Sequence, residues 1–311
     1  MAFVLGIDGG GSKTAAAVSD GISVFASLAA KGCNLNSVSS EHAQQALAEA
    51  VHGALASAGI RANEVFSVCA GIAGAASPEV AAKIAVLLAG LLPRAAIRVV
   101  GDTVIALEAA FSGGPGVVCI SGTGSVAFGR NERAEVTRAG GWGRIASDEG
   151  SGHWIGQRAV AKCMRAMDQG RSSKLVTAIM KHWSIATREQ LVQRCQREPV
   201  PNFADLFPIV LAAAEAGDPL ASEILNAAAV ELARITQVVL RRLVTGHSIQ
   251  HVAVTGSVFA HSPRVRHIYS NVIHAYHPEI QIRLIKRQPF EGAVQLAWKM
   301  LPGEKSQMFA N

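Results

Sequence analysis

The stretch GIDGGGSKT at residues 6–14 decides how the fold is interpreted, because it joins an apolar run to a glycine turn. Asp8 ends an expected strand, and three glycines follow it in a turn between two strands. Glycine suits such a turn because backbone without side chains brings N–H groups against phosphate oxygens in unusual dihedrals. Alone, the stretch fits a phosphate-binding hairpin and an ordinary glycine-rich hairpin equally well. The expected nucleotide ligands are Asp8, Gly9, Gly10, Gly11, Ser12, Lys13 and Thr14.

A second glycine turn favours the phosphate-binding interpretation. The stretch ISGTGS at residues 120–125 again follows an apolar run and again carries hydroxyls. The first stretch matches neither the P-loop consensus nor the GxGxxG consensus before a helix, so a different nucleotide fold is indicated. Two hairpins, one in each lobe and opposed across a cleft, would bind a polyphosphate. The expected ligands of the second hairpin are Gly122, Thr123, Gly124 and Ser125.

The order of apolar patterns predicts an α/β protein of two lobes. Three short apolar runs predict a strand meander at the start, and a four-residue apolar repeat predicts a helix over 40–59. The cluster of glycines and proline at 113–116 predicts the boundary between lobes. The pattern of residues 151–245 is mainly helical, and its apolar stripe indicates core packing. The predicted lobes are residues 1–115 with 290–311, and residues 116–289.

Composition excludes several classes of protein. The chain has 311 residues, enough for two domains, and its net charge of +6 comes from scattered basic residues that form no run typical of nucleic-acid binding. Five cysteines without a CxxC pair argue against a disulfide framework and a structural zinc. No signal-peptide pattern precedes Asp8, and the apolar stretches are too short or too charged to span a bilayer. We expect a reduced cytoplasmic protein that binds neither nucleic acid nor membrane.

Five motifs in this order, DGGGSKT, GDT, SGTGS, GGWGRIASDEGSG and TGSV, resemble those of the N-acetylglucosamine kinase and BadF/BadG/BcrA/BcrD ATPase family. The match covers nearly the whole chain. The resemblance implies an actin-like (ribonuclease H-like) fold, in which two related lobes, each a mixed sheet with flanking helices, hinge around a cleft that binds ATP and Mg²⁺. It also implies a homodimer.

The resemblance makes Asp102 the general base that takes the proton from the attacking sugar hydroxyl. Asp102 ends the expected strand 97–101, where side chains reach the carboxyl edge of a sheet. The structural alternative is an N-cap for a helix that starts at Thr103, and the two roles are compatible. Asp8 is the expected ligand of Mg²⁺, through bound water, because Mg²⁺ prefers carboxylate oxygens and keeps much of its hydration.

The resemblance assigns the sugar site to the glycine-rich segment 140–151. Asp148 is expected to accept hydrogen bonds from sugar hydroxyls, although Asp148 and Glu149 could also cap the following helix, the role favoured for Glu149. One of Asn34 and Asn36 is the expected sugar-binding asparagine, and the spacing leaves both open. The expected substrate ligands are Asn34, Asn36, Asp102, Gly141, Trp142, Gly143 and Asp148.

The resemblance places adenine against a glycine turn and a small helical residue. Gly256 and Ser257 supply the turn, and Ala214 is the small residue. Plain helix packing explains Ala214 equally well.

The predicted function is phosphoryl transfer from ATP to the 6-hydroxyl of N-acetylglucosamine, with glucosamine and N-acetylmuramic acid as alternative substrates. A rival within the family is an ATPase activator of acyl-CoA reductases or dehydratases, which needs cysteines that hold an iron–sulfur cluster between two subunits. A sugar-responsive repressor would need a helix-turn-helix domain before Asp8, for which seven residues leave no room. A non-catalytic actin-like scaffold is disfavoured because Asp102 is present.

Overall fold

A computed structural model describes residues 2–11, 13–29, 31–34, 38–75, 77–243 and 249–301 of the chain. The chain divides into two compact units, one up to Gly114 and again from Lys286 onward, the other from Pro115 to Ile285. The predicted lobes had their boundaries after residues 115 and 289. The unit boundaries fall at a glycine-rich turn and before the last helix. Each unit has its own sheet and core.

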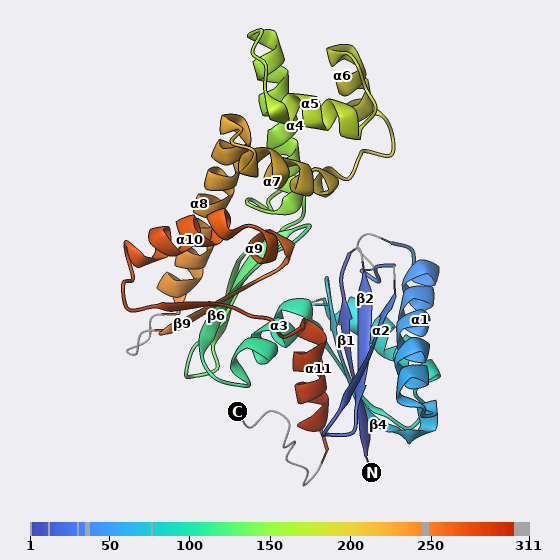
Figure 1. Cartoon of the computed structure of the whole chain (residues 1–311). Helices are drawn as coiled ribbons and strands as arrows, with labels where there is room; N and C mark the ends of the chain where they lie inside the picture. The colour runs from blue at the N-terminus through green and yellow to red at the C-terminus, as the bar shows by residue number, and fades with distance from the viewer. Residues whose placement is uncertain are drawn as a thin grey trace. The chain divides into compact units, whose positions relative to one another are not determined.

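The first unit is built on a five-stranded mixed sheet with the order β3-β2-β1-β4-β5 (Figure 1). The predicted meander forms its antiparallel part, and β4 and β5 run parallel to β1. The parallel strands therefore end at one common edge of the sheet. The strands are β1 (Phe3–Gly9), β2 (Thr14–Ser19), β3 (Val24–Ala29), β4 (Val65–Ile72) and β5 (Ala96–Gly101).

Two pairs of helices cover this sheet, one pair on each face (Figure 1). Helices α1 (Ser40–Ala58) and α2 (Pro78–Leu91) pack on one face, and α3 (Asp102–Phe111) and α11 (Pro289–Trp298) pack on the other. The helix predicted over 40–59 is confirmed: Ser39 caps its start, and Gly59 ends it in the left-handed region with φ 68°. A single turn of 3₁₀ helix, η1 (Ala62–Glu64), leads into β4.

Helix α11 is fixed to α3 by close backbone packing and by an ion pair. A Cβ atom on Gly292 would lie 2.0 Å from the carbonyl oxygen of Ile105, so only glycine allows this approach. The buried carboxylate of Glu108 pairs with the ammonium group of Lys299 just after α11. Helix α3, which starts at the carboxyl end of β5, is thereby held from its outer side.

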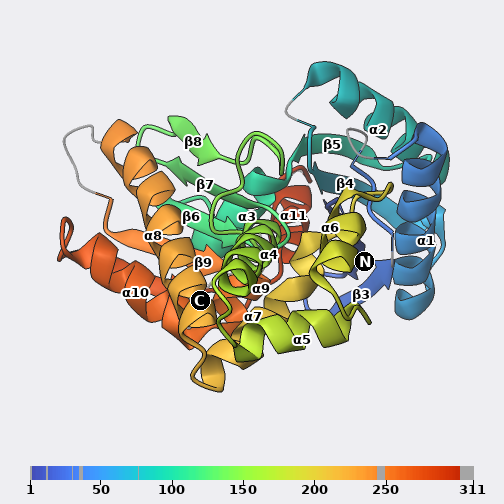
Figure 2. The ribbon, with the colours of Figure 1, turned by 90° about the horizontal axis from the view of Figure 1, so that it is seen from above.

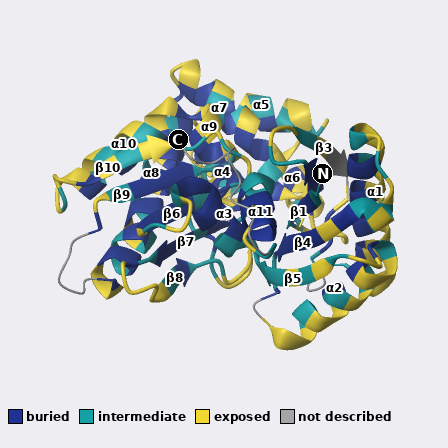
Figure 3. Ribbon diagram, turned by 90° about the horizontal axis from the view of Figure 1, so that it is seen from below, coloured by how far each residue is buried: buried dark blue, intermediate teal, exposed yellow. Residues whose placement is uncertain are grey.

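The second unit has a five-stranded sheet with the order β10-β9-β6-β7-β8. Strands β6 and β9 are parallel, and β6 to β8 form an antiparallel meander, so the pairing repeats that of the first unit. Figure 3 shows β6 and β7 as mostly buried. The strands are β6 (Gly116–Ser121), β7 (Ser125–Arg130), β8 (Val136–Gly140), β9 (His251–Thr255) and β10 (Gln281–Leu284).

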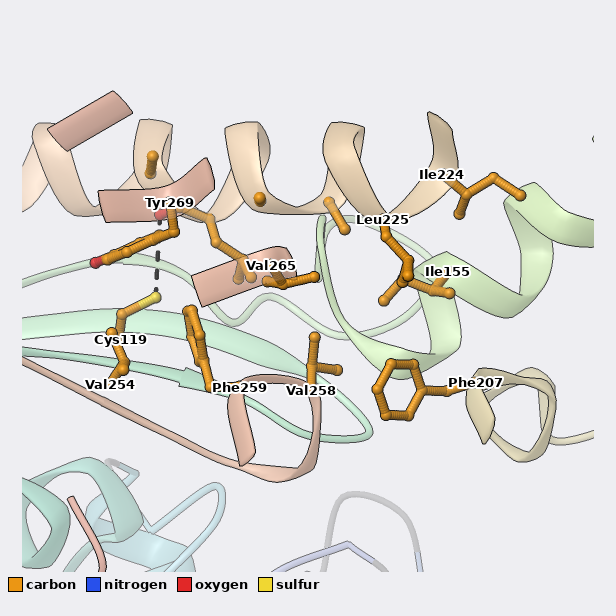
Figure 4. Close-up of a cluster of buried hydrophobic side chains, with 14 of the residues drawn as sticks. Cys119, Ile155, Phe207, Ile224, Leu225, Val254, Val258, Phe259, Val265 and Tyr269 are labelled. Carbon is orange, nitrogen blue, oxygen red and sulfur yellow. Dashed lines mark hydrogen bonds between the residues drawn. The ribbon is translucent and has the colours of Figure 1, made fainter. Parts of the chain in front are cut away.

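The helices of the second unit bury one large apolar cluster. The predicted apolar stripe of α8 packs into it, and α8 lies beside α10 (Figure 2). Figure 4 shows Cys119 of β6 facing Tyr269, whose ring meets that of Phe259 edge-on at 5.1 Å. The helices are α4 (Gly152–Asp168), α5 (Lys174–His182), α6 (Arg188–Gln196), η2 (Phe203–Leu206), α7 (Phe207–Glu215), α8 (Pro219–Arg242), α9 (Ser257–His261) and α10 (Pro263–His274).

No helix in the described ranges has both the length and the apolar character that a membrane span requires.

Candidate functional site

The first glycine stretch forms a tight hairpin between β1 and β2. Gly9 pairs with Thr14 in the ladder, and the Gly10 N–H donates to the carbonyl oxygen of Lys13 at 2.9 Å. The segment after β3 braces the hairpin, since the Thr14 hydroxyl donates to the Lys31 carbonyl at 2.9 Å. These contacts hold Gly10 and Thr14 in place on the two sides of the turn, whereas Ser12 lies outside the described residues.

The glycines of this hairpin are required for a different reason from the one that the sequence suggested. None of Gly9, Gly10 and Gly11 has a positive φ, so a left-handed backbone is not the reason for glycine here. Gly9 is needed for packing, because a Cβ atom there would lie 2.3 Å from the Cys33 sulfur. A Cβ atom on Gly11 would meet no atom of the described residues within 4 Å. Its backbone is therefore open to a ligand, which is the property that a phosphate site needs.

Asp8 and Asp102 lie at the same edge of the first sheet. Strand β4 separates β1 from β5, and the register pairs Asp8 with Gly71 and Gly71 with Val100, two residues before Asp102. The two carboxylates interact electrostatically. Burial, and then the charge of Asp102, raises the pKa of Asp8 from its usual 3.8 to about 6, although nearby Lys13 lowers it. A buried acid whose pKa is raised, with a second acid at the same sheet edge, is typical of functional sites.

Asp102 is the first residue of α3, and Gly101 is the N-cap residue. The expected N-cap role for Asp102, with a helix from Thr103, is therefore wrong. Its Oδ1 instead accepts the N–H of Thr103 at 2.9 Å, which leaves the carboxylate at the positive end of the helix dipole.

Asn34 follows directly on the segment that braces the first hairpin. The N–H of the preceding Cys33 donates to the carbonyl oxygen of Gly10 at 3.1 Å, and Asn34 is half-buried. The close approach requires Gly32, where a Cβ atom would lie 2.2 Å from the carbonyl oxygen of Gly11. The structure thus brings Asn34 to the hairpin, whereas Asn36 lies outside the described residues.

The second glycine stretch forms the equivalent hairpin between β6 and β7. Ser121 pairs with Ser125 at the end of the ladder, and the Gly122 N–H donates to the Gly124 carbonyl oxygen at 2.9 Å. As in the first hairpin, neither glycine has a positive φ. The start of α4 braces this turn, because the Gly152 N–H donates to the Gly122 carbonyl at 2.7 Å. Thr123 stands at the tip of the turn.

Asp148 joins this hairpin to the glycine-rich loop that precedes α4. Its buried carboxylate accepts hydrogen bonds from the backbone N–H groups of Ser125 and Gly143, which lower its pKa, while the larger effect of burial raises it. Asp148 has φ 69°, an uncommon conformation for a residue other than glycine. The capping alternative is wrong for Asp148 and for Glu149, because the hydroxyl of Ser151 accepts the Trp154 N–H and caps α4.

The loop after β8 carries the other expected sugar ligands. Gly141 and Gly143 have φ 71° and 93°, so this segment requires glycine for its backbone conformation. Trp142 is 61% exposed, and the guanidinium of Arg138 stacks over its ring at 4.0 Å from the centroid. The stack gives an exposed indole a defined orientation.

Gly256 lies against the base of the second hairpin. Strands β6 and β9 are parallel and pair Ile120 with Thr255, so both glycine turns emerge at one edge of the sheet. A Cβ atom on Gly256 would lie 2.2 Å from the Ser121 carbonyl oxygen, and Gly256 has φ 98°. Ser257 is the first residue of α9.

Replacing Gly256 with alanine is expected to destabilise the protein by about 1–3 kcal/mol, because the methyl group meets backbone that cannot move freely. Gly217→Ala is the matched control: φ is 84° there, but a Cβ atom meets nothing within 4 Å. Thermal unfolding should show a clearly smaller loss for Gly217→Ala; equal losses would mean that the contact with Ser121 has no effect.

Ala214 is buried in α7, which packs against α4, α5 and α8. This packing alone explains a small residue there. A role of Ala214 at adenine stays a prediction.

Several contacts that support these turns were not predicted from the sequence, including that of Ser125, which was expected only as a nucleotide ligand. The Ser121 hydroxyl donates to the Gly150 carbonyl at 2.9 Å, and the Ser125 hydroxyl to that of Glu149 at 2.8 Å. His153, buried at the start of α4, places its N–H 3.3 Å from the Thr123 carbonyl oxygen. Ser151 alone had a recognisable signal, a serine directly before a helical pattern.

The chain matches one known protein family over nearly its whole length. The model of the BadF/BadG/BcrA/BcrD ATPase family matches residues 5–297. The chain belongs to this family. An N-acetylmuramic acid/N-acetylglucosamine kinase of Clostridium acetobutylicum is 31% identical over 301 residues, 96% of this chain and 98% of that protein.

Solved structures agree on the fold of this BadF/BadG/BcrA/BcrD family chain. A Chromobacterium violaceum protein described as a candidate N-acetylglucosamine kinase has a TM-score of 0.78 at 24% identity, over 96% of this chain and 99% of that chain. A ROK family glucokinase of Streptomyces griseus, solved with glucose and AMPPNP, has a TM-score of 0.57 at 18% identity, over 95% and 98%. The predicted actin-like α/β fold with two mixed sheets is confirmed.

Within the described part of this family chain, no three His, Cys, Asp or Glu side chains gather into a group that could hold a metal ion. A cation at Asp8 would therefore depend on water and on a bound phosphate for its other ligands, which is the usual arrangement for Mg²⁺.

Proposed function

We propose that the chain is an ATP-dependent amino-sugar kinase that phosphorylates the 6-hydroxyl of N-acetylglucosamine. The observation that carries the proposal is the acid pair, Asp8 and Asp102, at the strand ends beside a glycine hairpin with open backbone. Sugar phosphorylation needs a carboxylate to accept the hydroxyl proton and donors to hold the phosphates. The name of the Clostridium acetobutylicum relative supports the same substrate class.

We assign ATP to the two hairpins and the glycine turn before α9. In this proposal residues 9–14 and 122–125 bind the phosphates through backbone N–H groups and through the hydroxyls of Ser12 and Thr123, since the hydroxyls of Thr14 and Ser125 already donate to backbone carbonyls. Gly256 and Ser257 bind the nucleoside. The half-buried carboxylate of Asp8, close to the ammonium group of Lys13, fits a magnesium site. Mg²⁺ bound there would neutralise charge on the phosphates.

The sugar ligands proposed are Asn34 or Asn36, Asp102, Asp148 and the backbone around Trp142. In this proposal Asp102 accepts the proton of the 6-hydroxyl. Asp148 already accepts two backbone N–H groups, and the acceptor sites left on a carboxylate suffice for sugar hydroxyls. Glucosamine and N-acetylmuramic acid remain the alternative substrates.

The cysteines disfavour an iron–sulfur ATPase activator as the second candidate. Cys33, Cys69, Cys119 and Cys163 are buried, and Cys195 lies half-buried on α6. A cluster shared between two subunits needs exposed thiolates on one surface. Iron analysis and the visible absorption spectrum of the purified protein test this directly.

A coupled ADP-release assay across N-acetylglucosamine, glucosamine, N-acetylmuramic acid and glucose tests the proposed function. We expect turnover that depends on an amino sugar and on Mg²⁺, with N-acetylglucosamine 6-phosphate as the product by NMR. Sugar-independent ATP hydrolysis, or phosphate on another hydroxyl, would contradict it. We also propose a cytoplasmic homodimer, which light scattering on the purified chain tests.

A further inference from the structure

Arg144 lies on a turn between two of the proposed sugar ligands, Gly143 and Asp148. The Gly143 carbonyl oxygen accepts the N–H groups of Ala146 and Ser147 at 3.1 and 2.9 Å, so Arg144 and the next residue form the crest of the turn. The Arg144 side chain is exposed and has no hydrogen bond or ion pair with any residue that the structure describes.

The acids of the same segment are already engaged. Asp148 accepts the Ser125 and Gly143 N–H groups, and Glu149 accepts the Ser147 hydroxyl at 2.9 Å. The guanidinium of Arg144 therefore has no carboxylate partner in its own loop.

The charge of Arg144 acts on the side chain of His153, which lies beside the second hairpin. Burial, and then Arg144, lowers the pKa of His153, whose backbone N–H bonds to Thr123 at the hairpin tip. Arg138, the other cation of the region, is stacked on Trp142. An unpaired guanidinium and an exposed aromatic ring thus lie on one short loop, a combination suited to a sugar that carries an anionic group.

We propose that Arg144 is a specificity-determining residue that binds the carboxylate of an acidic amino sugar. The inference rests on the proposed function and adds the residue that selects among its substrates: N-acetylmuramic acid, one of the alternatives there, carries a carboxylate that N-acetylglucosamine lacks. A guanidinium binds a carboxylate through two parallel hydrogen bonds, which an ammonium group does not reproduce. The competing occupant is a phosphate of the nucleotide, which the same experiment distinguishes.

The test compares kcat/KM for N-acetylmuramic acid and N-acetylglucosamine in the full chain and in Arg144→Gln and Arg144→Lys. We expect the ratio of the two values to fall about ten- to hundredfold in Arg144→Gln, and less in Arg144→Lys. Arg171→Gln, which removes an exposed charge on the turn after α4, is the matched control and should keep the wild-type ratio. An equal loss for both sugars would assign Arg144 to the nucleotide and overturn the proposal, as would an unchanged ratio.

Binding measurements separate this inference from the proposed function. Calorimetric titration of the same variants with each sugar measures affinity without turnover, so the ratio of affinities tests Arg144 even if no sugar is phosphorylated. NMR titration of His153 should show a raised pKa in Arg144→Gln, which verifies the fold and the placement of the charge. Failure of the wild-type chain to bind N-acetylmuramic acid would overturn the inference.

Discussion

Replacing Asp102 with asparagine is expected to lower kcat for sugar phosphorylation by roughly 10²- to 10⁴-fold, the usual contribution of a general base. Asparagine has nearly the same shape and can still accept the Thr103 N–H through its amide oxygen, so the start of α3 should be preserved. The thermal unfolding temperature should therefore change little. Steady-state assays with saturating ATP measure the effect.

Asp20→Asn is the matched control for Asp102→Asn. Asp20 is an exposed carboxylate in the turn between β2 and β3, and its Oδ1 accepts the N–H groups of Ile22 and Ser23 at 2.9 and 2.7 Å. An asparagine there keeps these bonds, and activity should remain at the wild-type level. Full sugar-dependent turnover in Asp102→Asn would mean that another group takes the proton.

Replacing Asp8 with asparagine is expected to reduce turnover by roughly 10²- to 10³-fold while it stabilises the fold. Burial and Asp102 raise the pKa of Asp8 from 3.8 to about 6. The folded protein therefore binds a proton more readily than the unfolded chain does, and stability is lost as pH rises from about 4 to about 6. At pH 7 the charge on Asp8 therefore lowers the free energy of unfolding of the wild type by about 1–3 kcal/mol. The uncharged asparagine variant does not lose this stability.

Chemical denaturation between pH 4 and pH 8, with EDTA present to exclude divalent cations, measures this difference. The unfolding free energy of the wild type should fall relative to that of Asp8→Asn across the window from about 4 to about 6. Parallel pH curves for the two proteins would show that Asp8 is not destabilised in its charged form. If Asp8→Asn kept both normal turnover and normal Mg²⁺ dependence, Asp8 would not be part of the proposed site.

Much of the fold could be predicted from the sequence because its signals are local. The strand meander, the helix over 40–59 and both glycine turns depend on short patterns that tertiary contacts do not override. Strands β8 and β10 were not predicted, since VTRAG and QIRL are short edge strands that mix polar and apolar residues. Pairing with β7 and β9, rather than an intrinsic pattern, makes them strands.

The candidate site was predicted less completely, because its geometry depends on long-range contacts. The motifs located the acids and the hairpins, but not the reason for the glycines: Gly9 is required by Cys33, which is distant in sequence. Likewise, the pKa of Asp8 depends on Asp102 across two strand spacings, roughly 10 Å. Such effects follow from register, which sequence patterns alone do not determine.

The repeated strand pairing allows the two sheets to be compared position by position. The last ladder pair is Gly9 with Thr14 in the first sheet and Ser121 with Ser125 in the second, so Ile120 occupies the position that corresponds to Asp8. An apolar side chain thus stands in the second sheet where the first sheet has an acid. The proton acceptor and the metal ligand of the proposed reaction therefore both belong to the first unit, and the second unit contributes hairpin and loop residues.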